Sequence, residues 1–161
     1  MAVISLTSLV DAPLQRVFDL SRSIELHIIS TGRTNEKAVE GVTGGLIGLG
    51  ETVTWQAFHL FKQRRFTSKI TAFDPPFYFR DEMQNGDFKK FEHDHFFKLV
   101  KGKTEMKDRV ILESPFGLLG TIVTRLFLKR YITTLLLERC KIIRDYAETD
   151  KWKTILTDKN G

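Results

Sequence analysis

The sequence predicts an α+β fold in which an antiparallel sheet curls around one long C-terminal helix. Between residues 36 and 113, apolar and polar side chains alternate in several short segments, which is the pattern of β-strands. Residues 114–150 contain no proline after Pro115 and are rich in Leu, Ile, Arg, Lys and Glu, a composition that favours a long helix. A sheet followed by a single helix can bury its apolar face by wrapping around that helix.

The N-terminal part of the chain predicts one strand and two short helices. Val3–Val10 alternates loosely in hydropathy and indicates the first strand. The Asp-Ala-Pro sequence that ends at Pro13 then begins a helix, whose apolar side includes Val17 and Phe18. A second short helix is expected over Ser23–Ile29.

Six further strands are expected after these helices, which gives a sheet of seven. Asp74-Pro75-Pro76 and Asn85-Gly86 are turn signals, and Lys101-Gly102-Lys103 joins the last two strands into a hairpin. The six predicted strands cover residues 35–40, 51–61, 65–73, 77–83, 88–100 and 104–113.

Gly41–Gly50 is a glycine-rich segment between two predicted strands. A dinucleotide-binding loop needs such glycines between a strand and a helix, and a phosphate-binding loop needs a Gly-Lys-Ser/Thr ending. Neither context is present. We therefore predict a flexible hairpin loop whose apolar residues Leu46, Ile47 and Leu49 cover the rim of a cavity, and which moves when a ligand enters.

The apolar stripe of the long helix changes side near Phe127. Apolar residues of 119–126 share one side of the helix, and those of 128–146 share roughly the opposite side. One interpretation is a kink, or a short separate helix that covers the end of the sheet. The other is a mobile flap over a cavity, which Gly117 and Gly120 would loosen.

Composition and charge argue against several classes of function and partner for this chain, among them nucleic-acid binding and membrane insertion. The chain has 161 residues, a net charge of +5 and a pI near 9.4. Its basic residues are scattered among acidic ones without a nucleic-acid motif, so no nucleic-acid partner is expected. The single cysteine, Cys140, excludes an intramolecular disulfide. With no signal peptide and no membrane-spanning apolar run, we expect one cytoplasmic domain over residues 1–161 without stable membrane insertion.

Several motifs resemble those of a known superfamily, and the most specific is Gly44–Trp55, GGLIGLGETVTW. Over nearly the whole chain the sequence resembles the START-like, Bet v 1-like superfamily of polyketide cyclases/dehydrases and lipid-transport proteins, and within it a bacterial branch of undefined activity. The resemblance implies the helix-grip fold, with an internal cavity between sheet and helix. It selects no function, because members include carriers, cyclases, hydrolases and chaperone cofactors. The other matching motifs are Glu36-Lys37-Ala38, Asp81-Glu82-Met83, His93-Asp94-His95 and Glu113-Ser114-Pro115.

Strand alternation places four ionisable residues on faces that are otherwise apolar and should point inward. These are His93, His95, Asp81 and Asp108, and Arg139 falls in the apolar stripe of the long helix. Because buried charges must be paired, one interpretation is a satisfied hydrogen-bond network. The alternatives are a polar patch that orients a ligand and a catalytic acid–base pair in which an aspartate fixes the tautomer of a histidine.

His93-x-His95 also places two potential metal ligands on one strand face. A third ligand, His59 or Asp108, would have to converge on them, and the sequence does not establish that it does. We therefore expect no bound metal and no cofactor. Covalent catalysis is disfavoured as well, because the sequence has no nucleophile elbow and Cys140 has no evident activating base.

The leading hypothesis is that the protein binds a hydrophobic small molecule, a lipid or a polyketide-like ring, in an internal cavity. A cyclase or dehydratase that uses His93, His95, Asp81 or Asp108, and a protein-interaction module of the chaperone-binding type, are the alternatives. Whether the protein is an enzyme stays open. The residues expected to bind the ligand are Trp55, Phe79, Phe91, His93, His95, Phe97, Met106, Asp108, Leu119, Ile132, Leu135, Leu136 and Arg139.

Overall fold

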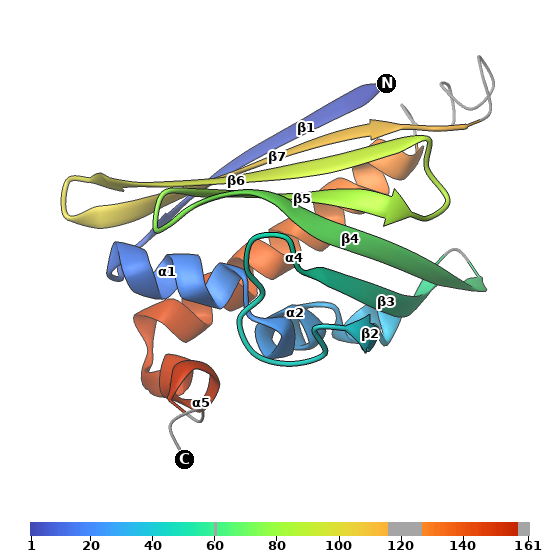
Figure 1. Ribbon diagram of the computed structural model, residues 1–161. Coiled ribbons are helices and arrows are strands. Elements are labelled where there is room, and N and C mark those ends of the chain that lie inside the picture. The colour runs from blue at the N-terminus through green and yellow to red at the C-terminus, as the bar shows by residue number, and fades with distance from the viewer. Residues whose placement is uncertain (60, 116–126, 158–161) are drawn as a thin grey trace.

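The computed structural model describes residues 1–59, 61–115 and 127–157, and these contain a seven-stranded antiparallel sheet (Figure 1). The strand order is β1-β7-β6-β5-β4-β3-β2, so each strand from β2 to β7 lies beside its neighbours in sequence, and β1 returns to pair with β7. β5 and β6 are therefore well inside the sheet, and β1 and β2 form its edges. The strands are β1 (Ala2–Val10), β2 (Lys37–Gly41), β3 (Thr52–His59), β4 (Lys62–Asp74), β5 (Tyr78–Asn85), β6 (Lys90–Val100) and β7 (Lys103–Glu113).

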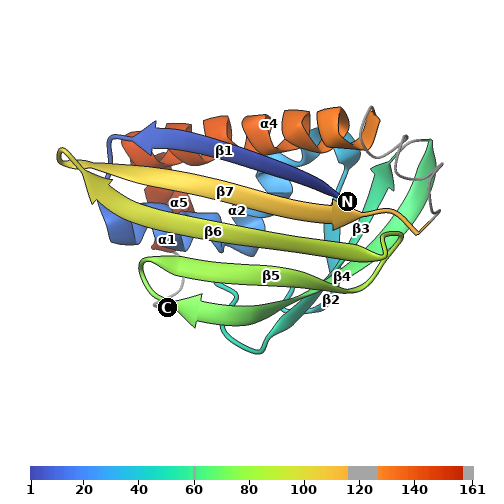
Figure 2. The same cartoon turned by 90° about the horizontal axis from the view of Figure 1, so that it is seen from above.

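The long helix and the two helices after β1 lie on one side of the sheet (Figures 1 and 2). α4 (Lys129–Glu148) runs along the sheet, and α1 (Leu14–Ser21) and α2 (Ile24–Ser30) lie beside it. The Ser23 side chain begins α2, because its hydroxyl accepts a hydrogen bond from the backbone N–H of Leu26 at 3.2 Å. The short elements are η1 (Gly32–Thr34), η3 (Asp150–Trp152) and α5 (Lys153–Leu156).

The predicted fold class is confirmed, with an antiparallel sheet, two short helices after the first strand and a long helix near the C-terminus. The predicted helix over residues 114–150 is seen from Lys129 onward. Gly117 and Gly120, on which the flap interpretation depended, lie outside the described residues, and so does most of the stripe that would reveal a kink. No helix in the described ranges is long and apolar enough to cross a membrane.

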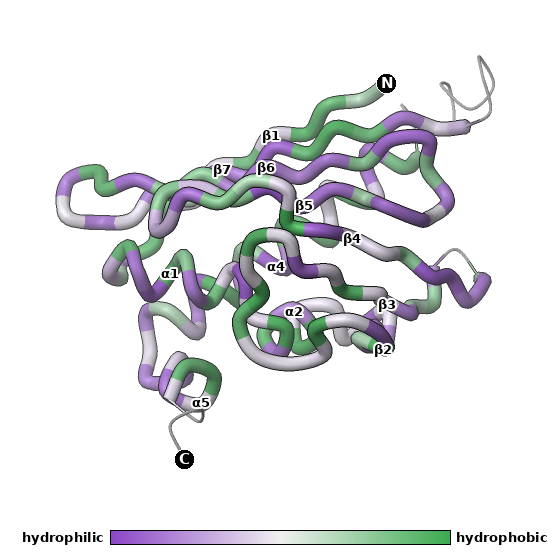
Figure 3. The backbone as a smooth tube through the Cα atoms, viewed as in Figure 1, coloured by the Kyte–Doolittle hydropathy of each residue, from purple (hydrophilic) through white to green (hydrophobic). Residues whose placement is uncertain are grey.

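Apolar and polar residues alternate along much of the strands (Figure 3), and the buried apolar ones pack into clusters with helix residues. One core cluster centres on Phe18 of α1 and includes Cys140 and Ile143 of α4. A second cluster joins Leu136 of α4 to residues of β1 and β7, among them Val110. α4 therefore contributes to both core clusters.

The glycine-rich loop between β2 and β3 is fastened to the junction of α1 and α2. The backbone N–H of Ile24 donates to the carbonyl of Gly45 at 2.9 Å, and the N–H of Ile47 donates to the carbonyl of Arg22 at 3.2 Å. Ile47 is buried, whereas Leu46 and Leu49 are exposed. These hydrogen bonds argue against the flexible loop that the glycines predicted. Of the three residues predicted to cover the cavity rim, Ile47 points inward.

Candidate functional site

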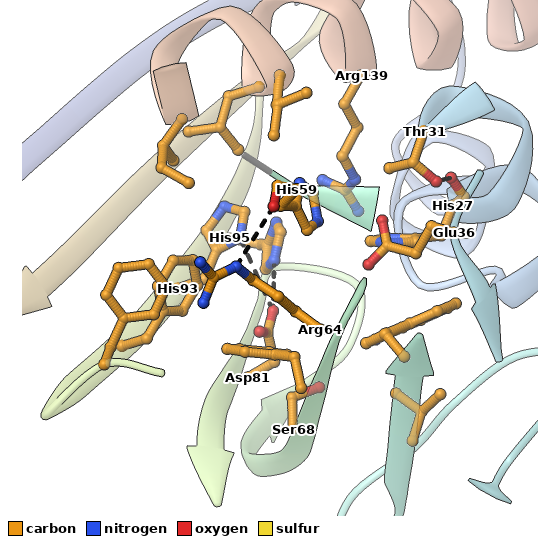
Figure 4. Close-up of a pocket in the computed structure, with 18 of the residues that line it drawn as sticks. His27, Thr31, Glu36, His59, Arg64, Ser68, Asp81, His93, His95 and Arg139 are labelled. Atoms are coloured by element: carbon orange, nitrogen blue, oxygen red, sulfur yellow. Dashed lines mark hydrogen bonds and ion pairs between the residues drawn. The ribbon is translucent and has the colours of Figure 1, made fainter. Parts of the chain in front are cut away.

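A cavity of about 660 Å³ lies between the sheet, α2 and α4. Most of its wall is apolar, and polar side chains gather at a few places (Figure 4). The strands contribute their inward faces, and α4 closes the opposite side. The lining residues discussed below are His27, Glu36, Trp55, His59, Phe79, Asp81, Phe91, His93, His95, Tyr131, Ile132, Leu135, Leu136 and Arg139.

The pairing of β5, β6 and β7 brings His93, His95, Asp81 and Asp108 together. Asp81 lies opposite His93 in the β5–β6 pair, and Asp108 lies opposite His95 in the β6–β7 pair. Residues two apart on a strand share a face, so all four side chains project to the inner side. Asp94 lies between the two histidines in sequence and therefore points to the opposite face of the sheet. There it accepts hydrogen bonds from tyrosine and arginine side chains of β5.

Asp108 is the centre of this polar cluster, with 1% of its side chain exposed. One of its oxygens, Oδ1, lies 2.8 Å from His93 Nε2 and 2.9 Å from His95 Nδ1, although the second contact lacks the angle of a hydrogen bond. The other nitrogen of His95, Nε2, lies 3.0 Å from Asp81 Oδ2. Arg139 Nη1 lies 3.7 Å from Asp108 Oδ1. The histidines and aspartates therefore come together, with Arg139 at the margin of the cluster. The predicted network is not fully satisfied, because the buried atoms His95 Nδ1 and Arg139 Nη1 have no hydrogen-bond partner in the described part of the chain.

The two histidines have opposite electrostatic environments. Burial lowers the pKa of His93, and the neighbouring His95 lowers it further. Burial also opposes a charge on His95, but its contacts with Asp108 and Asp81 outweigh this effect and raise the pKa of His95. Burial acts against ionised aspartates too, yet the contacts with both histidines hold the pKa of Asp108 well below its usual range. These directions favour ionised aspartates, and of the two histidines they favour a positive charge on His95 over one on His93.

A second group of polar residues lines the cavity near α2 and β3. The His27 ring stacks on Trp55 with centroids 4.1 Å apart, and His27 Nε2 lies 3.3 Å from Glu36 Oε2. His59 Nδ1 is hydrogen-bonded to the Tyr131 hydroxyl of α4 at 2.8 Å. All four histidines of the chain thus line one cavity. The sequence pattern did not mark His27 and Glu36 as cavity residues, because neither falls on a strand face whose alternation indicates that it points inward.

Most of the predicted ligand-binding residues line the cavity, and three do not. Phe97 and Met106 point inward but are covered by α1, where the Phe18 ring lies 5.4 Å from that of Phe97 and Ser21 Oγ lies 3.6 Å from Met106 Sδ. Asp108 lies behind the histidines rather than on the cavity wall. Leu119 is outside the described residues. The predicted residues that line the cavity are Trp55, Phe79, Phe91, His93, His95, Ile132, Leu135, Leu136 and Arg139, and the catalytic candidate Asp81 lines it too.

Cys140 is expected to react slowly with thiol reagents in the native protein. Its side chain is buried against Asp108, with Sγ 3.6 Å from Oδ2, and burial together with that carboxylate raises the pKa of the thiol to about 11. At about pH 8 roughly one thiol in a thousand is then ionised, and the thiolate is the reactive form. Ellman's reagent should modify the native protein at least about 100-fold more slowly than the urea-unfolded chain. Equal rates would contradict the burial of this helix face.

Solved structures with the same architecture include plant and bacterial proteins, although no protein-family model and no curated protein matches the sequence. Ara h 8.0201 superposes with a TM-score of 0.67 and 17% identity, covering 91% of this chain and 97% of that one. Ginseng major latex-like protein 151 from Panax ginseng gives 0.68 and 12%, covering 92% and 98%. A START superfamily protein from Mycobacterium smegmatis gives 0.68 and 14%, covering 91% and 97%. The chain therefore has the helix-grip fold of Bet v 1-like and START-like proteins.

Proposed function

We propose that the protein binds a hydrophobic small molecule, a lipid or a polyketide-like ring, in the cavity between the sheet and α4. The observation that carries this proposal is a cavity of about 660 Å³ with a mainly apolar wall and a few convergent polar groups. Small-molecule sites in proteins have this composition and volumes of about 300–1,000 Å³. Burial of apolar ligand surface would supply about 25 cal/mol per Å².

Arg139 is the side chain best placed to orient an acidic or carbonyl-bearing ligand. Its Nη2 donates a hydrogen bond to the backbone carbonyl of Ser21, which fixes the guanidinium at the cavity wall. Its Nη1 is buried, lies 3.7 Å from Asp108 Oδ1 and makes no hydrogen bond within the described part of the chain. A donor held in this way favours a ligand oxygen, because an unsatisfied buried donor costs about 1–3 kcal/mol. A fatty-acid carboxylate would supply that oxygen.

Fatty acids of increasing chain length and aromatic polyketides are expected to bind saturably at one site per chain. Trp55 lines the cavity, whereas Trp152 packs against Arg16 of α1, so the Trp152→Phe variant makes Trp55 emission the reporter of occupancy. Affinity should rise with chain length until the cavity is full, because each buried CH₂ contributes about 0.8 kcal/mol. Isothermal titration calorimetry should give the same affinities.

A matched pair of substitutions on α4 tests whether the ligand occupies the cavity. Leu135→Trp fills it from the helix side and should weaken binding at least about tenfold, or about 1.4 kcal/mol. Leu137→Trp introduces the same side chain on the same helix at a residue that is 46% exposed and outside the lining set, and it should bind as the wild type does. Ligand affinity of these two variants should be measured by calorimetry, because the added tryptophan would contribute to the fluorescence signal. Absence of saturable binding to the wild type would leave the protein-interaction module as the better hypothesis.

A cyclase or dehydratase is the second candidate, and one observation favours it. His93 Nε2 lies 2.8 Å from Asp108 Oδ1, the arrangement in which a carboxylate orients an imidazole whose other nitrogen faces a substrate. Mass spectrometry of the polyketides recovered after incubation distinguishes the two candidates. A carrier returns the compound unchanged, and a dehydratase returns a product that has lost water. A cyclase returns a ring-closed product, which is recognised by its fragmentation pattern if it is an isomer of the substrate.

A further inference from the structure

Asp81, His93 and His95 form a group of donor atoms on the sheet side of the cavity. One potential ligand atom from each residue lies within 4.8 Å of the others, and no other group of three such donors is this close in the described ranges. All three residues line the cavity. We infer that this group binds one divalent first-row transition-metal ion through two imidazole nitrogens and one carboxylate oxygen.

The distances between the donor atoms fit a shared ion. Because a carboxylate only accepts hydrogen bonds, the contact with Asp108 places the proton of His93 on Nε2 and leaves Nδ1 with a free lone pair. That Nδ1 lies 3.8 Å from Asp81 Oδ2, and His95 Nε2 lies 3.0 Å from the same oxygen. Tetrahedral zinc with bonds of about 2.0–2.1 Å holds neighbouring ligands about 3.3 Å apart, so the two distances lie on either side of the required one.

Asp108 completes the arrangement behind the two histidines. Its Oδ1 lies 2.8 Å from His93 Nε2 and 2.9 Å from His95 Nδ1, so one buried carboxylate contacts the ring nitrogen of each histidine that faces away from the ion. Metal-binding histidines commonly have such a carboxylate partner, which fixes the ring orientation and strengthens the ligand. The rings are further held by contacts with one another and with Phe79. The His93 and His95 centroids lie 3.7 Å apart, and the Phe79 ring stacks on that of His95 at 4.1 Å.

The ligand set also indicates what kind of site this is. Three protein ligands leave at least one coordination position open, as in catalytic zinc sites and in the two-histidine, one-carboxylate sites of ferrous enzymes. Since the three residues lie on the cavity wall, that position faces the cavity, where an oxygen of a bound molecule can reach it. An ion there replaces the proton shared by His95 Nε2 and Asp81 Oδ2.

This inference reverses the expectation drawn from the sequence, which predicted no metal because no third ligand was assured. The third donor is Asp81, from the neighbouring strand β5, rather than His59 or Asp108. His59 bonds to Tyr131, and Asp108 occupies the position behind the ligands.

The test uses full-length protein that has been stripped with a chelator and freed of any affinity tag, with no organic ligand present. Titration with Co²⁺ should saturate at one ion per chain and give visible absorption of the intensity typical of four- or five-coordinate cobalt. Zn²⁺ should displace the cobalt and abolish the colour. Imidazole ¹⁵N spectra of the wild type should show Zn²⁺-dependent shifts of the His93 and His95 resonances and unchanged His27 and His59 resonances.

Three substitutions separate this site from adventitious binding. Asp81→Asn should abolish saturable cobalt binding, and Asp108→Asn should weaken it about 10–100-fold through loss of support for the rings. His59→Gln removes a cavity histidine outside the site and should bind cobalt as the wild type does. The inference is overturned if the stripped wild type takes up no ion, or if zinc shifts His27 or His59 instead of His93 and His95. The wild-type spectra decide the matter even if Asp81→Asn fails to fold.

Discussion

Replacing Asp108 by alanine is expected to lower the free energy of unfolding by about 3–5 kcal/mol, because it leaves buried charges without their partner. The Asp108 carboxylate contacts His93 Nε2 at 2.8 Å, His95 Nδ1 at 2.9 Å and Arg139 Nη1 at 3.7 Å, and none of these groups is more than 11% exposed. Without Asp108, the Arg139 cation loses a counter-charge, His95 loses a carboxylate neighbour and the N–H of His93 loses its acceptor. Urea unfolding followed by circular dichroism measures the loss.

Glu105→Ala on the same strand is the matched control for Asp108. The Glu105 carboxylate pairs with Lys98 at 3.0 Å, but that lysine is 66% exposed. Surface pairs of this kind contribute about 0–1 kcal/mol, so the unfolding midpoint should move little. If Asp108→Ala and Glu105→Ala have similar midpoints, the buried cluster does not stabilise the fold in the way that its geometry requires.

Replacing Phe18 by alanine is expected to destabilise the protein by about 3–5 kcal/mol. Phe18 is fully buried, and its ring packs against those of Phe73, Phe79 and Phe97 at centroid distances of 5.6, 5.6 and 5.4 Å. Removal of the ring leaves a cavity among three other aromatic side chains, which relax only partly into it. Thermal and urea unfolding should both show the loss.

Two comparisons calibrate the Phe18 result. Phe18→Leu keeps most of the apolar volume and should lose less than about 1.5 kcal/mol. Phe58→Ala removes the same side chain from β3 at a position that is 56% exposed, and its effect should stay below about 1 kcal/mol. A Phe18→Ala protein as stable as Phe58→Ala would mean that α1 does not pack on the sheet as described. Because Phe79 also stacks on His95, the variant should disturb the polar cluster too.

Structural features that depend only on residues close together in the sequence could be predicted. Alternation on a strand has a period of two, so the inward faces that carry Asp81, His93, His95 and Asp108 followed from the residue order alone. What could not be predicted was which inward residues reach the cavity. Phe97 and Asp108 share those faces, but one is covered by α1 and the other lies behind two histidines. These positions depend on packing between distant segments.

The third donor of the metal site was missed for a related reason. Asp81 was assigned to the correct face, but its position opposite His93 depends on the register between β5 and β6. The two strands are observed at Tyr78–Asn85 and Lys90–Val100, and three of the four predicted boundaries were one or two residues away. A shift of that size is enough to conceal which side chains meet across two strands.

The division of the cavity wall between sheet and helix has a consequence for how this protein can diversify. The histidine–aspartate cluster comes from β5, β6 and β7, whose positions are fixed by backbone hydrogen bonds on both sides of each strand. The apolar wall opposite comes from α4, where Ile132, Leu135 and Leu136 depend on side-chain packing alone. Substitutions on α4 can therefore change the shape of the ligand that the cavity accepts, while the polar residues on the strands stay the same. Directed evolution for altered selectivity should accordingly begin with these three helix residues.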